Sequence, residues 1–188
     1  MLGERRVRDG RADDARPIAE VHVDGWRWGY RGLVPDDVLN GLSVDEFARL
    51  WAERLASLPE DSFLVVAECG ERVVGFALAG RPRPDQELPG GTAQLHYLYV
   101  TQQVAGTGAG RALMDAVISR AHSAGFTALI VWVLTQNRRA RRFYEAAGFQ
   151  PDGREEDHPH PSVPVVMRAV RYLRRLTPGG AGALRADR

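Results

Sequence analysis

Three glycines at alternate positions, Gly106, Gly108 and Gly110, come directly before a segment with helical periodicity. Glycine loses more backbone freedom on folding than any other residue, so their presence at a helix start indicates a special demand on the backbone. The first N–H groups of a helix lack partners within the helix and carry a partial positive charge. With no side chains in the way, they can close around an anion, and Thr107 can add a hydroxyl. Residues 105–111 therefore predict a phosphate or pyrophosphate site.

Two common phosphate motifs do not match this stretch. A P-loop closes with Gly-Lys-Ser/Thr, but Arg111 and Ala112 follow the last glycine. A dinucleotide fingerprint has the spacing Gly-x-Gly-x-x-Gly and an acidic residue about 20 positions later. Here the third glycine is one position early, and residues 126–134 contain no acid. A flexible turn and a nucleotide-binding protein of another fold stay open as alternatives at this point.

A second group of residues could handle protons. Asn137 and Tyr144 are seven positions apart, about two helical turns, so they share one face of the helix predicted over 137–147. Ala140 and Phe143 add an apolar stripe beside them. Taken alone, Tyr144 is typical of a core aromatic whose hydroxyl is satisfied elsewhere. Together with the glycine motif, it is a candidate catalytic residue.

The elements that must hold these residues follow from hydrophobic periodicity and turn signals. Helices are predicted over 12–30, from Ser43 to about 58, from the glycines to about 124, and over 137–147; strands are predicted over 4–9, 62–69, 72–79, 92–100, 126–134, about 149–156 and 163–170. Pro35 can open a further short helix, and Gly70 and Glu71 indicate a tight hairpin. The order is β-α-α-β-β-β-α-β-α-β-β. Its middle strands should be antiparallel and its later β-α-β passages should add a parallel part, which predicts an α/β fold with a mixed sheet.

Length and composition bound the remaining possibilities. The 188 residues suit one domain, predicted over 1–176, and the tail 177–188 has too little apolar content to pack, so we expect it to be disordered. A formal net charge of +1 argues against nucleic-acid or membrane-surface binding. Without a secretion signal or an apolar stretch of about 20 residues, a soluble cytoplasmic protein is expected.

Other residues are expected to carry no chemistry. The single cysteine, Cys69, excludes an internal disulfide and a multi-cysteine metal site. His158 and His160 lie in a Pro-rich loop without a third ligand, so no metal site is expected. The arginine run near the C-terminus is expected to be a solvated chain end; it comprises Arg168, Arg171, Arg174 and Arg175.

The stretch "LYVTQQVAGTGAGRALM" (98–114), followed after one strand by "NRRARRFYEAAGF" (137–149), resembles the GCN5-related N-acetyltransferases, or GNAT family. The resemblance extends over about residues 5–170. It implies the acyl-CoA N-acyltransferase fold, with acetyl-coenzyme A as acyl donor bound where strands 92–100 and 126–134 splay apart. It implies transfer of the acetyl group by direct attack of a primary amine, on a small molecule or on a peptide or protein. Dimers are common among similar proteins, which leaves a homodimer open.

The resemblance also implies roles for individual residues. The pyrophosphate would lie on the backbone N–H groups of Ala105, Gly106, Thr107, Gly108, Ala109, Gly110 and Arg111. The pantetheine arm would pair with the main chain of Leu98, Tyr99 and Val100. Asn137 would hold that arm, and Tyr144 would face the thioester sulfur as the catalytic acid.

The chain departs from the family pattern at two positions. Gln94 stands where many relatives have a carboxylate, and an amide cannot take a proton. His96, two residues on, is our candidate base because it titrates near neutral pH; a relayed water or His22 are the alternatives. Ala105 stands where the family usually has Arg or Gln. These departures leave a non-catalytic acyl-coenzyme A sensor as a rival to the enzyme.

The acceptor pocket in this fold would lie between residues 22–32 and the loop 157–162. Trp26 and Tyr30 are four residues apart and would share a helical face. With Asp24 they could hold a cationic amine. The alternative for each aromatic residue is a place in the core.

Overall fold

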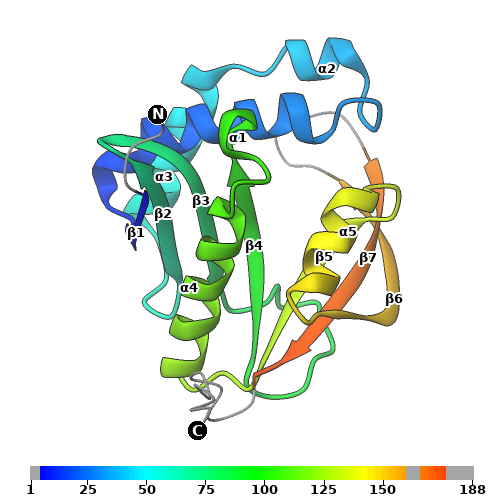
Figure 1. Ribbon diagram of the computed structural model, residues 1–188. Coiled ribbons are helices and arrows are strands. Elements are labelled where there is room, and N and C mark those ends of the chain that lie inside the picture. The colour runs from blue at the N-terminus through cyan, green and yellow to red at the C-terminus, as the bar shows by residue number, and fades with distance from the viewer. Residues whose placement is uncertain (1–4, 160–165, 177–188) are drawn as a thin grey trace, which may run out of the picture.

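The computed structural model describes residues 5–159 and 166–176, which form one seven-stranded sheet with helices on both faces (Figure 1). The strands are β1 (Arg5–Asp9), β2 (Phe63–Cys69), β3 (Arg72–Gly80), β4 (Thr92–Val100), β5 (Ala128–Leu134), β6 (Gln150–Pro159) and β7 (Val166–Arg175). The helices are α1 (Ala15–Gly29), α2 (Asp36–Asn40), α3 (Val44–Ala56), α4 (Ala109–Ser123) and α5 (Arg138–Ala146), with 3-10 turns η1 (Ala12–Asp14) and η2 (Gln102–Val104). The tail 177–188 and part of the loop 157–162 lie outside the described residues.

Local signals in the sequence account for the ends of several elements. The Ser43 hydroxyl accepts a hydrogen bond from the Glu46 amide at 3.3 Å and caps the start of α3. Gly70 has φ of +62° in the hairpin between β2 and β3. Gly148 has φ of +83° just after α5, where a left-handed residue ends a helix at little cost. The predicted helix and strand order is confirmed, and α2 is the short helix expected after Pro35.

The sheet is mixed, with strand order β1-β2-β3-β4-β5-β7-β6. Strands β1 to β4 form an antiparallel meander, and β4 and β5 are parallel across the crossover helix α4. The second crossover, through α5, leads to β6, but β6 does not lie beside β5. Instead β7 returns from β6 and inserts between them, antiparallel to both. Only one of the two β-α-β passages therefore produces a parallel pair.

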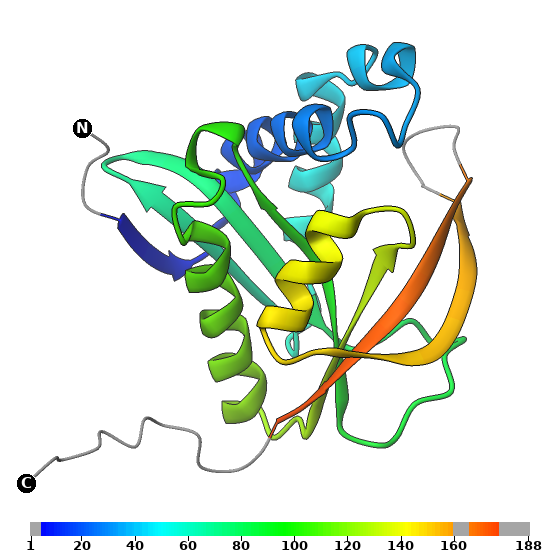
Figure 2. The same ribbon diagram turned by 45° about the vertical axis from the view of Figure 1, so that its right-hand side comes forward.

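Helices cover both faces of the sheet (Figure 2), and the core has two parts, one on each face. On one face, α4 and α5 cover an aliphatic cluster that includes Leu113, Leu129 and Tyr172. On the other, α1 and α3 cover a cluster rich in aromatic rings, among them Trp26 and Phe76. None of the described helices combines the length and the apolar character that crossing a bilayer requires.

The last strand is longer than predicted and changes the role of its arginines. β7 runs to Arg175, five residues beyond the predicted end. Arg171 is buried in the sheet, and its Nε donates to Asp152 Oδ2 at 2.6 Å. Arg174 donates to the Ala147 carbonyl. The prediction of a solvated chain end is therefore wrong for Arg171, which is buried in a strand paired with β5, whereas Arg168 and Arg175 are exposed as predicted.

Candidate active site

The parallel strands β4 and β5 separate halfway along their length. Their register runs from Thr92 opposite Ala128 to Leu95 opposite Val131 and stops there, although β4 continues for five more residues. At the same point, β4 carries a bulge against β3: Leu78 pairs with Tyr97, and Ala79 pairs with Leu95. His96 is thus the extra residue. Because a bulge bends and twists its strand, it accounts for the direction in which β4 leaves β5.

Beyond the bulge, β4 offers main-chain groups to the opening. The Thr101 amide donates to the Val74 carbonyl of β3 at 2.9 Å. Because the main-chain N–H and C=O groups of successive strand residues point alternately to the two sides, those of Leu98 and Val100 face away from β3. Tyr99, between them, directs its main chain to β3. The Trp28 indole already donates to the Val100 carbonyl at 3.0 Å. Both main-chain groups of Leu98 and the amide of Val100 are therefore left for a ligand that lies along the strand.

The opening leads into a cavity of about 450 Å³ that connects the two faces of the sheet. It is lined by residues from α1, β4, β5, α5 and residues 105–111, called the glycine loop below. The lining residues are Gly25, Trp28, Gly29, Tyr30, Leu95, His96, Tyr97, Leu98, Tyr99, Val100, Ala105, Gly106, Gly108, Gly110, Arg111, Val131, Trp132, Val133, Leu134, Asn137, Arg139, Ala140, Phe143 and Tyr144. Most of the wall is apolar, with a few polar groups at defined places. This composition is typical of a pocket for an organic ligand.

The glycine loop has the backbone conformation that its sequence predicts. Gly106 has φ of +75° and Gly108 has φ of +93°, and nothing lies within 4 Å of a Cβ built on Gly106. The amides of Ala105 and Thr107 donate within the loop, at 3.2 Å each. No main-chain bond is made by the amides of Gly106, Gly108, Ala109, Gly110 and Arg111 within the described residues, since the first bond of α4 comes from Ala112. Unpaired N–H groups of this kind at the start of a helix are suited to an anion.

Arg5, at the start of β1, supports this loop from behind. Its Nη1 donates to the Thr107 carbonyl at 2.7 Å, and its Nη2 donates to the Thr107 hydroxyl at 2.8 Å. That hydroxyl also donates to the Val104 carbonyl at 2.8 Å. The contacts place a positive charge beside the loop opposite the cavity. Sequence reasoning missed Arg5, because 102 positions separate it from Thr107 and no local pattern connects them.

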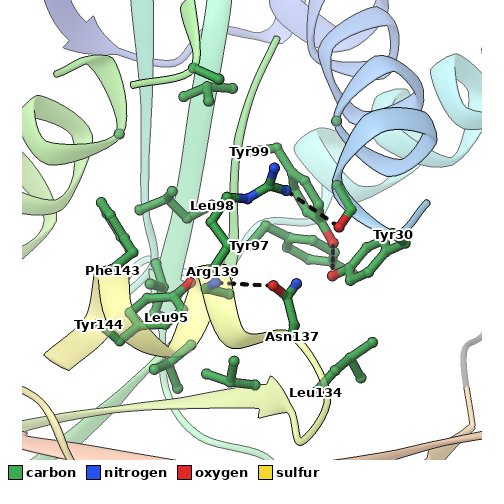
Figure 3. A pocket seen from close by; sticks show the side chains of 18 of the residues that line it. Tyr30, Leu95, Tyr97, Leu98, Tyr99, Leu134, Asn137, Arg139, Phe143 and Tyr144 are labelled. Carbon is green, nitrogen blue, oxygen red and sulfur yellow. Dashed lines mark hydrogen bonds between the residues drawn. The ribbon is translucent and has the colours of Figure 1, made fainter. Parts of the chain in front are cut away.

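Asn137 and Tyr144 lie on the same face of α5 and both line the cavity (Figure 3). Asn137 caps the helix: its Oδ1 accepts from the Ala140 amide at 3.0 Å, which leaves its NH₂ group for a ligand. The Tyr144 hydroxyl makes no hydrogen bond within the described part of the chain, although the residue is buried, with only 8% of its surface exposed. Burial, and then the charge of Tyr30, raise the pKa of Tyr144 well above its usual value. The hydroxyl therefore holds its proton at neutral pH.

The predicted acceptor residues separate in the structure. Tyr30 lines the cavity, and its hydroxyl lies 3.1 Å from that of Tyr99. Trp26 is buried behind them and donates to the Tyr99 hydroxyl at 3.0 Å. Asp24 does not line the cavity, because its carboxylate accepts from the Gln102 amide at 2.7 Å at the start of η2. Trp26 is thus a core residue, as the alternative interpretation expected, and Asp24 supports the turn before the glycine loop.

The candidates for a base also have different surroundings. His96 lines the cavity, and its Nε2 lies 3.0 Å from the Arg81 carbonyl. Gln94 is buried outside the cavity, where its carbonyl accepts from the Gln86 side chain at 2.8 Å. His22 is buried among aromatic rings, and its Nδ1 accepts from the Trp51 indole at 3.1 Å. Of the three, only His96 reaches the cavity.

The pKa of His96 is lowered, first because burial disfavours the charged ring and further by the positive charges of Arg54 and Arg83. The Arg81 carbonyl opposes this shift in part. A ring with Nε2–H directed at that carbonyl carries its lone pair on Nδ1. At neutral pH the cavity thus contains a neutral imidazole and a protonated phenol, the two groups that a proton-transfer reaction needs.

Comparisons with known proteins agree with this geometry. Residues 29–149 match the model of the Acetyltransferase (GNAT) family. The chain is 37% identical over 152 residues to the uncharacterized N-acetyltransferase YuaI of Bacillus subtilis strain 168, covering 81% of this chain and 83% of that protein. Among solved structures, the PaiA N-acetyltransferase of Thermoplasma acidophilum in complex with coenzyme A has a TM-score of 0.68 at 16% identity, over 92% of this chain and 99% of that one. YncA of Salmonella typhimurium with acetyl-CoA has a TM-score of 0.65 at 18% identity, over 94% and 96%.

Proposed function

Because this chain belongs to the Acetyltransferase (GNAT) family, we propose that it transfers the acetyl group of acetyl-CoA directly to the primary amine of a small molecule or peptide. One observation carries the proposal. The opening between β4 and β5 joins the bare amides of the glycine loop to an unbonded, protonated Tyr144 hydroxyl within one cavity. An acyl carrier with a diphosphate at one end and a thioester at the other has the two features that these places would bind.

The residues that line the opening suit the parts of acetyl-CoA. The five free amides beside Gly106 and Gly108 would hold the pyrophosphate, since no Cβ obstructs Gly106 and the N-terminus of α4 adds partial positive charge. The main-chain groups of Leu98 and the amide of Val100 would pair with the pantetheine arm. The Asn137 NH₂ group would hold the same arm from α5. The thioester supplies an already activated acyl group, so no covalent intermediate with the protein is needed.

In the proposed mechanism, the side chains position the reactants and move protons. Tyr144 is the general acid: its hydroxyl, protonated at neutral pH, gives that proton to the departing sulfur. His96 is the base that accepts the proton lost by the attacking amine. The apolar wall from β5 and α5 keeps bulk water away from the thioester. Holding both reactants in one cavity should provide most of the acceleration.

The role of His96 predicts a pH dependence. Its lowered pKa lies below the usual value of 6.5, so the ring is neutral at pH 7 and takes up a proton only as the pH falls further. We expect kcat/KM to fall below pH 6.5, about tenfold per pH unit at the acid end, and His96→Gln to remove this acid limb. A pH–rate profile of both proteins measures the effect. Any limb from ionisation of the acceptor amine should persist in the variant. An unchanged acid limb in His96→Gln would exclude His96 as the base.

The direct test of the proposed function is a screen of primary amines, following release of the coenzyme A thiol at fixed acetyl-CoA concentration. We expect turnover with at least one amine and its loss in Tyr144→Phe. Calorimetric binding of coenzyme A without turnover of any amine would instead identify a non-catalytic acyl-CoA sensor. Thermal stabilisation by ATP or NAD but not by coenzyme A would contradict the proposed donor altogether.

Arg5 should affect the binding of acetyl-CoA and not the chemical step. In Arg5→Met the apolar stem remains, but both hydrogen bonds to Thr107 and the positive charge behind the loop are lost. We expect the KM for acetyl-CoA to rise about 3- to 10-fold with little change in kcat, since a charged hydrogen bond typically contributes a few kcal/mol at most. Steady-state kinetics check this. Arg6→Met is the matched control, because Arg6 is exposed and does not line the cavity.

A further inference from the structure

The charges around the cavity restrict which amine it can accept. None of the described residues that line it is Asp or Glu. A cationic acceptor such as a polyamine would find no carboxylate there, and the predicted partner Asp24 faces the turn at Gln102 instead. The lining residues with basic side chains are His96, Arg111 and Arg139. His96 is held neutral by burial, and Arg111 is paired with Asp115 at 2.9 Å.

Arg139 therefore carries the one positive charge that no carboxylate balances among the described lining residues. Its guanidinium lies over the Trp28 ring, with Cζ 3.9 Å from the ring centroid, which is within the range of a cation–π contact. Its Nη2 donates to the Gly29 carbonyl in a long bond of 3.4 Å. The remaining N–H groups have no acceptor within the described residues. Burial lowers the pKa of Arg139, although a guanidinium stays protonated at any physiological pH.

Arg139 lies on the α1 side of the cavity, beside Gly29 and Trp28 (Figure 3). It extends from α5 towards α1, where Gly29 and Tyr30 begin the opposite wall. Tyr30, which follows Gly29, lines the same cavity as Tyr144. Because residues 22–32 form the wall predicted for the acceptor, a group bound to Arg139 on this side would belong to the acceptor.

We propose that the acceptor is a small aminocarboxylate, whose carboxylate binds the Arg139 guanidinium while its amine points to the thioester. A guanidinium over an aromatic ring keeps N–H groups free at its edge, and these match a carboxylate in two parallel hydrogen bonds. The positive charge would also disfavour the ammonium form of the nearby amine and so favour the neutral nucleophile. This inference rests on the proposed acetyl transfer.

The test compares amino acids with their own primary amides, using methionine, leucine and phenylalanine at saturating acetyl-CoA and following thiol release. The amine of an amide is the less basic of the two, so intrinsic reactivity favours the amide. We expect the amino acid to be preferred about 10- to 30-fold in kcat/KM by the unchanged protein, a gain typical of a charge-assisted hydrogen bond. Arg139→Gln should lose this preference, and Arg139→Lys should keep part of it.

Two controls separate the explanations. Arg138→Gln removes an exposed positive charge from the same helix without touching the cavity, so it should keep the preference. The KM for acetyl-CoA should not change in Arg139→Gln, and a rise there would assign Arg139 to the donor and overturn the inference. Equal kcat/KM values for the amino acids and their amides would overturn the inference about Arg139, while the proposed acetyl transfer would stand. No turnover with any amine would overturn the proposed function, and this inference with it.

Discussion

Replacing Tyr144 with phenylalanine is expected to lower kcat about 100- to 1000-fold and to leave the KM for acetyl-CoA nearly unchanged. The substitution removes one hydroxyl from a cavity wall and keeps the ring that packs against Phe143 and Phe149. Proton transfer by a positioned group is typically worth about 10²- to 10⁴-fold, and the hydroxyl is the protonated donor that the cavity offers on α5. Steady-state kinetics with an accepted amine measure the loss.

The same substitution should barely affect stability, because the Tyr144 hydroxyl bonds to no described residue. Tyr172 gives the opposite case. Its hydroxyl donates to Glu145 at 2.8 Å and accepts from Arg141 at 2.9 Å. Tyr172→Phe should therefore lower the free energy of unfolding by about 1 kcal/mol and leave kcat unchanged. If both variants lost activity in proportion to stability, Tyr144 would be a structural residue.

Gly108→Ala should raise the KM for acetyl-CoA about 30- to 100-fold. A residue with a side chain at φ of +93° is strained by about 1–2 kcal/mol, and the new Cβ would lie 3.4 Å from Arg5 Nη1. The loop can relieve this strain by rotating, which turns the amides of Gly108 and Ala109 away from the phosphate direction. Several charge-assisted hydrogen bonds then weaken together. Kinetics and calorimetry with coenzyme A report the change.

Gly70→Ala separates strain from binding. Gly70 also has positive φ, +62°, with open space around its Cβ, but it lies in the β2–β3 hairpin far from the cavity. We expect both glycine variants to lose similar stability by thermal or chemical unfolding and only Gly108→Ala to lose affinity for coenzyme A. Equal KM values in the two variants would show that the loop amides do not hold the donor.

The sequence was sufficient wherever a feature depends on near neighbours along the chain. The conformations of Gly106 and Gly108, the cap of α3 at Ser43 and the shared face of Asn137 and Tyr144 follow from backbone preferences and helical spacing. The order of elements and the mixed sheet follow from periodicity and from the length of each connection. Each of these features has few alternative conformations, because it depends on residues that lie within one or two turns of each other along the chain.

Contacts between distant segments required the tertiary structure. The bulge at His96, the bond from Trp28 to Val100, the support of Thr107 by Arg5 and the insertion of β7 each depend on how whole elements pack. The sequence places Asp24 on a helix, but it does not show that the Asp24 carboxylate bonds to the Gln102 amide and not to a substrate. The charge of Arg139 is likewise visible in the sequence, while its position over Trp28 is not. Such contacts form only when the core fixes the relative orientation of α1, α5 and β4, and no local preference carries that information.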